Sequence, residues 1–125
     1  MPVKKILVVD DSPTERFFLA DLLHKNGYDV LTAENGEQGV AVAKTGVPDL
    51  ILMDVVMPGL NGFQATRQLA RDPGTQKIPV ILCTTKNQET DRVWGMRQGA
   101  VEYIVKPVVA EELLGKISAL VQEVQ

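Results

Sequence analysis

The sequence predicts an α/β protein in which a parallel sheet is covered on both faces by helices. Short apolar runs alternate with segments of helical pattern along the whole chain. Several of these runs are continuously apolar, as expected for strands that are buried on both faces of a sheet. Helix start and stop signals fall between the runs. Such an alternation favours a parallel sheet joined by right-handed crossovers.

Each of the five expected strands is one of the short apolar runs. In chain order these are Ile6–Val9, Val30–Ala33, Leu50–Met53, Val80–Cys83 and Tyr103–Val105. Helices are expected between and after them, at Pro13–Lys25, Gly36–Lys44, Gly62–Arg71, Gln88–Gln98 and Ala110–Val124.

The expected helix boundaries carry local signals of their own. Ser12 and Glu15 form the pattern of a capping box, with Pro13 at the first helical position. Three glycines fall where helices should stop, namely Gly27, Gly46 and Gly99. In the fourth helix, Val93 and Met96 fit a buried face and Trp94 lies off that line, so Trp94 either fills a small satellite cluster or belongs to a partner surface.

Length, charge and cysteine content narrow the class of protein. A chain of 125 residues is enough for one domain with a real core. A net charge of -3 argues against an electrostatic nucleic-acid binder. The lone Cys83 permits no internal disulfide, and no apolar run is long enough for a signal peptide or a membrane span. We therefore expect a soluble, cytoplasmic protein without a membrane partner.

Polar residues that can carry chemistry lie at the ends of four expected strands. Asp10 and Asp11 follow the first strand, Asp54 follows the third, Thr84 ends the fourth, and Lys106 follows the fifth. Ligands of parallel α/β sheets bind at this edge. Three carboxylates close together would repel each other, so the site calls for a cation, and oxygen ligands suit Mg²⁺. A carboxylate in such a site can attack phosphorus, with a lysine and a hydroxyl to stabilise the phosphoryl charge.

Four segments resemble the signatures of bacterial two-component response-regulator receiver domains, over essentially the whole chain. They are VVDDSPTE, ILMDVVMPGLNGF, VILCTT and YIVKP. The resemblance implies a flavodoxin-like (βα)5 three-layer sandwich with strand order 2-1-3-4-5. It also implies a cis peptide bond before Pro107.

The same resemblance implies a role for each site residue. Asp54 is expected to be the phosphoacceptor, with Thr84 and Lys106 contacting the phosphoryl group and Tyr103 acting with Thr84 as the switch. The expected Mg²⁺ ligands are Asp10, Asp11, Asp54 and the backbone carbonyl of Val56. Three further positions, Val56, Thr85 and Lys86, are expected to modulate the site, since they flank it and vary in the family.

Longer segments are similar to CheY-like regulators of type IV pilus motility. These are SPTE, VMPGLNGFQATRQL, TTKNQETDRVWGMRQGA and YIVKPV. The similarity implies a single receiver domain over residues 1–125 with no output domain. It further implies phosphorylation by a CheA-like sensor histidine kinase, and a protein target that binds the face made by the fourth helix, fifth strand and fifth helix.

Two other functions stay open on the sequence. The chain could be a phosphate sink that drains a shared kinase and has no output partner. It could also be a Mg²⁺-dependent phosphatase with an aspartyl nucleophile, although the haloacid-dehalogenase type needs a D-x-D pattern after the first strand, and here that position reads DDS.

Overall fold

The expected strands form one parallel sheet in the order β2-β1-β3-β4-β5. The computed structural model describes residues 3–124, with side chains up to residue 120. The strand order confirms the expected flavodoxin-like topology. The elements are β1 Lys5–Val9, α1 Pro13–Lys25, β2 Asp29–Ala33, α2 Gly36–Gly46, β3 Leu50–Met53, α3 Gly62–Arg71, β4 Val80–Thr84, α4 Glu89–Gln98, β5 Glu102–Val105 and α5 Ala110–Val124.

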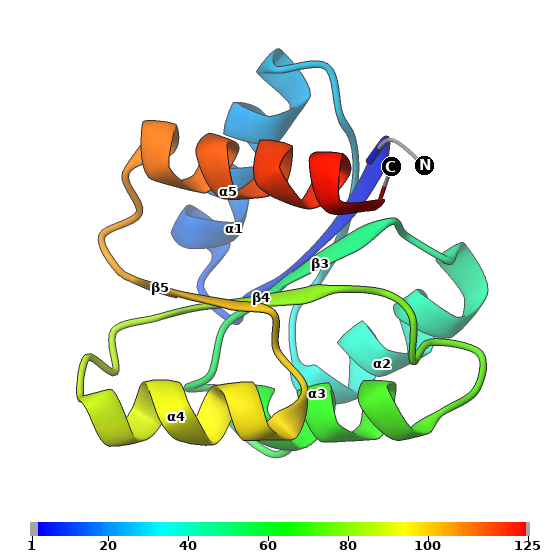
Figure 1. Cartoon of the computed structure of the whole chain (residues 1–125), viewed down its shortest axis with the longest axis vertical. Helices are drawn as coiled ribbons and strands as arrows, with labels where there is room; N and C mark the ends of the chain where they lie inside the picture. Colours follow the sequence, from blue (N-terminus) through cyan, green and yellow to red (C-terminus); the bar gives the residue numbers. More distant parts are fainter. Residues whose placement is uncertain (1–2, 125) are drawn as a thin grey trace.

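Helices cover the sheet in two layers. Figure 1 shows α1 and α5 on one face, and α2, α3 and α4 on the other. Alternate residues of β1 enter different cores, because successive side chains of a strand point to opposite faces. Ile6 and Val8 pack with α1 and α5, whereas Leu7 and Val9 pack with α2 and α3. Strands β3 and β4 are buried along their whole length and β1 from Ile6 onward, and their side chains divide between two separate apolar clusters.

Two predictions about helix ends are corrected in detail. Ser12 caps α1, its hydroxyl accepting from the Glu15 amide at 3.3 Å, but the structure gives Glu15 no reciprocal bond, so only half of the capping box is present. Helix α2 runs through Gly46, and its left-handed residue is Val47, with φ 42°. Gly46 is instead a packing position, since a Cβ there would lie 2.7 Å from Leu31 Cδ1.

The predicted buried face of α4 is wrong. Val93 and Met96 are 39% and 37% exposed, and the buried residues are Gly95 and Gln98. The physical reason is close approach of the helix to the sheet, because a Cβ on Gly95 would lie only 2.7 Å from Leu82 Cδ1. A glycine that makes this contact adds no hydrophobic signal to the pattern. Trp94 is also exposed, at 48%.

The carboxyl end of the sheet is set by two further features. The Lys106-Pro107 peptide bond is cis, as the resemblance implies. Beyond the end of β3, Gly62 begins α3, and its amide donates to the Val55 carbonyl at 2.9 Å.

Across the described residues, no helix combines the length and apolar character that crossing a bilayer requires.

Candidate functional site

The site begins where β1 and β3 end side by side. The Asp10 amide donates to the Ala33 carbonyl of β2 at 3.2 Å, and the Asp54 amide donates to the Val9 carbonyl of β1 at 2.9 Å. These ladder bonds fix the backbone of both aspartates at the edge of the sheet. Their side chains are buried, with Asp10 1% and Asp54 7% exposed.

Three carboxylates meet at this edge, as predicted. Oxygen atoms of Asp10, Asp11 and Asp54 all lie within 4.8 Å of one another. Asp11 is exposed, so one side of the cluster is open to water. An oxygen-only set with an open side fits a small divalent ion such as Mg²⁺, which keeps several of its waters when it binds protein carboxylates.

Lys106 joins the carboxylate cluster from the fifth strand. Its ammonium nitrogen lies 2.8 Å from Asp10 Oδ2 and 3.7 Å from Asp54 Oδ1. The Lys106 amide donates to the Thr84 carbonyl at 2.8 Å, which ties the lysine to the end of β4. The structure thus brings Lys106 to the cluster, and its shorter contact is with Asp10.

Burial and charge together set the protonation of the site. Burial raises the pKa of Asp54 to about 6; Lys106 opposes this rise, whereas the charges of Asp10 and Asp11 add to it. Burial alone would lower the pKa of Lys106, but the hydrogen bond to Asp10 and the charges of Asp54 and Asp10 outweigh it and raise that pKa. The lysine therefore stays charged, and Asp54 is ionised above about pH 6.

Thr84 and Tyr103 are linked through the backbone of Lys86. Thr84 is fully buried, and its hydroxyl oxygen accepts from the Lys86 amide at 3.2 Å. The Tyr103 hydroxyl donates to the Lys86 carbonyl at 2.8 Å. A displacement of the loop at Lys86 would therefore affect both side chains that were predicted to form the switch.

The three predicted modulators lie at the surface beside the site. Val56 is 55% exposed, although the preceding Val55 is buried. Thr85 and Lys86 are exposed as well, and the Lys86 ammonium lies 3.8 Å from Asp91 Oδ1 rather than within the carboxylate cluster. All three are in a position to act on groups that approach from solvent.

Some supporting residues were not predicted. Arg16 donates to the Asp10 carbonyl at 2.7 Å, and the Ser12 amide donates to Asp10 Oδ1 at 2.9 Å. No sequence signal identifies Arg16, because its contact depends on how α1 packs. Asn61 and Gln64 form a complete capping box at the start of α3, which the N-x-x-Q pattern could have revealed.

The family follows from the comparison of the sequence with known families. A model described as the response regulator receiver domain matches residues 6–118. The chain belongs to the response regulator receiver family. The acidic cluster, Thr84 and Lys106 all fall within the matched residues of this receiver.

Relatives and solved structures agree with this assignment. The receiver is 61% identical over 116 residues to Protein PilH of Pseudomonas aeruginosa, a match that covers 93% of this chain and 96% of PilH. It is 40% identical over 119 residues to the phosphate regulon transcriptional regulatory protein PhoB of the same organism, covering 95% of this chain and 52% of PhoB. This receiver therefore spans about half the length of PhoB.

Two solved structures have the same fold. The chemotaxis protein CheY4 of Vibrio cholerae has a TM-score of 0.88 at 31% identity, with 94% of this chain and 98% of that chain covered. The receiver domain of a sensor histidine kinase from Pseudomonas aeruginosa also has a TM-score of 0.88, at 29% identity, with 96% and 98% covered. That second structure holds a magnesium ion in its active-site cleft.

Proposed function

We propose that this receiver is a switch that takes a phosphoryl group from the phosphohistidine of a sensor histidine kinase onto Asp54. The observation that carries the proposal is the position of the Lys106 ammonium, 2.8 Å from Asp10 and 3.7 Å from Asp54. A fixed cation beside a buried carboxylate supplies the positive charge that a transferred phosphoryl group needs.

Transfer requires Asp54 in its ionised form. With its pKa at about 6, most of the carboxyl is ionised at neutral pH. An Asp54 oxygen attacks phosphorus, the P–N bond to the histidine breaks, and its electron pair returns to the imidazole nitrogen. The product is an acyl phosphate on Asp54. Lys106 then moves from Asp10 toward a phosphoryl oxygen, and the Thr84 hydroxyl donates to another.

The acidic cluster would hold Mg²⁺ through Asp10, Asp11, Asp54 and the backbone carbonyl of Val56. When bound, the ion would neutralise charge on the phosphoryl oxygens. Carboxylate oxygens of the three aspartates lie within 4.8 Å of one another, and this spacing and the open side at Asp11 support the three aspartate ligands of the set.

The output of the switch is proposed to be a protein contact on the face of α4, β5 and α5. When the Thr84 hydroxyl turns to the phosphoryl group, its hydrogen bond from the Lys86 amide is lost. Tyr103 donates to the carbonyl of that same Lys86, so its position changes too. Phosphorylation then shifts an equilibrium between two arrangements of this face that both exist beforehand.

The similarity to PilH supports a role in type IV pilus motility, with a CheA-like kinase as phosphodonor. We further propose that residues 1–125 act as a single receiver domain in the cytoplasm, where such a kinase has its ATP. The position after β1 reads Asp10-Asp11-Ser12, which does not favour a haloacid-dehalogenase type of phosphatase.

The test is phosphorylation by a small donor. Incubation with acetyl phosphate and Mg²⁺ should add the mass of one phosphoryl group to the intact protein. Asp54→Asn should abolish the addition, and EDTA should suppress it. Asp21→Asn is the matched control, since Asp21 forms only an exposed pair with Lys25 at 3.0 Å. Full labelling of Asp54→Asn would refute the proposal.

A second measurement separates a signalling switch from a phosphate sink. Amide exchange of the phosphorylated protein should change at residues 84–98 and 102–106. A phosphorylated protein whose exchange changes only at the carboxylate cluster would favour the sink, because no surface would then report the modification.

A further inference from the structure

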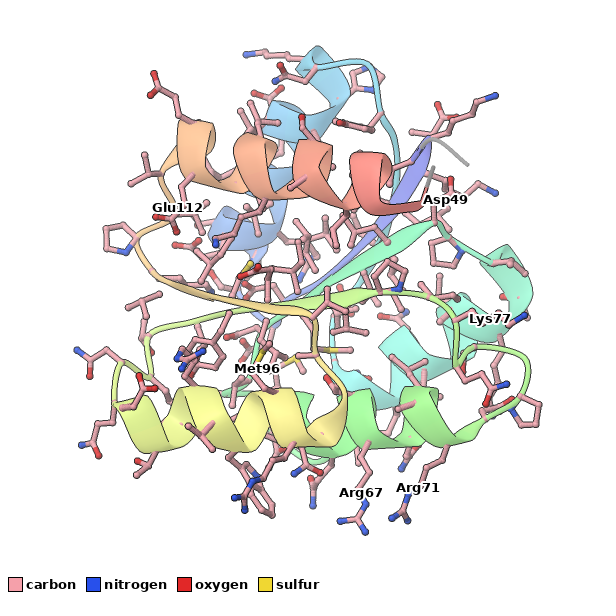
Figure 2. All side chains as sticks on the ribbon, in the orientation of Figure 1. Asp49, Arg67, Arg71, Lys77, Met96 and Glu112 are labelled. Carbon is pink, nitrogen blue, oxygen red and sulfur yellow. The ribbon has the colours of Figure 1, made fainter. Side chains whose placement is uncertain are left out.

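A cationic groove lies between α3 and α4, on the opposite side of those helices from the sheet. Three arginines and Trp94 line a hollow of about 430 Å³, and the arginines are Arg67, Arg71 and Arg97. Figure 2 shows Arg67 and Arg71 extending from α3 away from the sheet. This groove is separate from the phosphorylation site, which lies at the carboxyl edge of the sheet.

The arginines of the groove have no carboxylate partner among the described side chains. Helix α3 carries no acidic residue, and the two acidic residues of α4 are engaged elsewhere. Glu89 pairs with Arg92 at 2.6 Å, and Asp91 lies 3.8 Å from Lys86. The groove is thus a patch of uncompensated positive charge on a chain whose net charge is -3.

Helix dipoles explain only part of this arrangement. Arg71 and Arg97 lie in the last turns of α3 and α4, where a cation is favoured by the helix terminus. Arg67 lies a full turn earlier, and the indole of Trp94 is 48% exposed, so neither is accounted for by helix stability.

Trp94 and Arg97 line the cationic hollow and also a second hollow beside it, in which Val93 and Trp94 supply the apolar surface. The second hollow measures about 290 Å³; besides Trp94 it is lined by Val93, Thr90, Arg97 and Glu89, and the Glu89 carboxylate is paired with Arg92. The floor between the helices is closely packed, since a Cβ on Gly99 would lie 3.0 Å from Ala70 Cβ. Both hollows are open to solvent, whereas small-molecule sites bury most of their ligand. This shape fits a segment of another protein.

We propose that the α3–α4 groove binds an acidic segment of a partner protein, with carboxylates at Arg67 and Arg71 and an apolar side chain beside Trp94. Arginine recognises carboxylates with paired hydrogen bonds, and tryptophan and arginine are, with tyrosine, the side chains enriched at the energetic centres of interfaces. The groove is formed in the structure of the unphosphorylated protein, so the unphosphorylated protein is the right material for a test.

The probe is a short fluorescent peptide with glutamates on both sides of a Phe-Leu pair. Its anisotropy is followed at about 0.15 M salt, where long-range attraction is screened beyond ~8 Å. Trp94 is the single tryptophan of the chain, so its emission gives an independent signal with the unlabelled peptide. We expect saturable binding with both signals.

The variant Arg67→Gln/Arg71→Gln should weaken binding by about tenfold or more, which is the effect of losing roughly 1.4 kcal/mol. The control Lys25→Gln/Lys77→Gln removes the same charge elsewhere and should change the Kd less than about twofold, because net charge alone contributes little at this salt concentration. Circular dichroism of both variants checks that they fold.

Several results would overturn the proposal. These are no saturable binding up to about 1 mM peptide, equal losses in the two variants, or equal affinity for a peptide with glutamine in place of glutamate. Tighter, arginine-dependent binding of a single-stranded oligonucleotide would assign the groove to nucleic acid instead. Self-association that is lost in Arg67→Gln/Arg71→Gln would place a second copy of the chain there.

Discussion

At the scale of single residues, the buried charge of Asp54 lowers the free energy of unfolding of the metal-free protein, by an amount that depends on pH. Its pKa rises from 3.8 to about 6 on folding, first because of burial and then because of Asp10 and Asp11. Between these values the folded state binds more protons than the unfolded state, so the free energy of unfolding falls as pH rises through this window. Above about pH 6 Asp54 is ionised in the folded state, and its destabilising effect reaches its full size.

Asp54→Asn should therefore stabilise the metal-free protein at neutral pH. One pKa unit corresponds to about 1.4 kcal/mol; after allowance for solvent screening we expect a gain of about 1–2 kcal/mol at pH 7.5. The gain should shrink as pH falls from about 6 to 4 and vanish by about pH 3, where the carboxyl is protonated in both states. Urea unfolding in EDTA at the two pH values measures it. A gain of the same size at both would contradict the charge argument, and Asp21→Asn serves as the exposed control.

The sequence predicted which residues gather at the site, but it did not predict which side chains contact each other there. Asp10, Asp11, Asp54, Thr84 and Lys106 were expected at one edge because the strands that carry them are parallel, and the structure brings them there. That the Lys106 ammonium lies closer to Asp10 than to Asp54 was not predictable. The two distances, 2.8 Å and 3.7 Å, differ by 0.9 Å, and no residue pattern encodes a difference that small in side-chain position.

At the scale of elements, strand and helix positions were predictable because their signals are local. Four of the five helices begin at the expected residue, and in the fourth Gln88 is the residue before the first turn. The buried face of α4 was not predictable, because Gly95 makes its close contact with Leu82 and carries no side chain. Where a helix packs through a glycine, hydrophobic periodicity points to the wrong face.

Gly62 couples the start of α3 to the backbone of Asp54, the proposed phosphoacceptor. A Cβ at Gly62 would overlap the Asp54 carbonyl oxygen and lie 2.7 Å from Val55 Cα. Both are backbone atoms, so Gly62→Ala must displace the chain at Asp54. We expect a loss of about 2–3 kcal/mol in the free energy of unfolding, as for other overpacked sites, together with slower labelling by acetyl phosphate.

Gly115→Ala is the matched control for Gly62→Ala. Gly115 lies within α5, and a Cβ there meets nothing within 4 Å. Alanine should stabilise this helix by roughly 0.5–1 kcal/mol and leave labelling unchanged. Thermal unfolding and the initial rate of phosphorylation measure both variants. Similar effects of the two substitutions would show that the contact with Asp54 is not the cause.

At the scale of the whole molecule, the rate at which a reagent labels the Cys83 thiol should measure how often the protein unfolds globally. The thiol is buried in the cluster beneath α1 and α5, and burial raises its pKa to about 12. A thiolate is the reactive form, so the native protein should be inert and labelling should require unfolding. We expect labelling by a thiol reagent at pH 8 to be at least about a thousandfold slower than in urea.

Added Mg²⁺ should slow the labelling of Cys83 further. An ion that binds only the folded state stabilises it by mass action, so a concentration ten times the Kd slows labelling about tenfold. The rate of release of the chromogenic thiol gives the measurement. Fast labelling without denaturant would mean that the α1–α5 face opens locally, and no Mg²⁺ effect would mean that the acidic cluster does not bind the ion.

The strand order also has a consequence during synthesis of the protein. Strand β1 pairs first with β2, which follows it closely along the chain, and β3, β4 and β5 then add one after another on the other side of β1. A chain that leaves the ribosome at about 5–20 residues per second can extend this sheet in a single direction. Asp10 and Asp54 come together as soon as β3 has emerged, but the cation that neutralises them arrives with residue 106. For the seconds in between, the nascent protein carries its acidic pocket without its own lysine, and the counter-charge within reach is that of Arg16 and of ions from the surrounding solution.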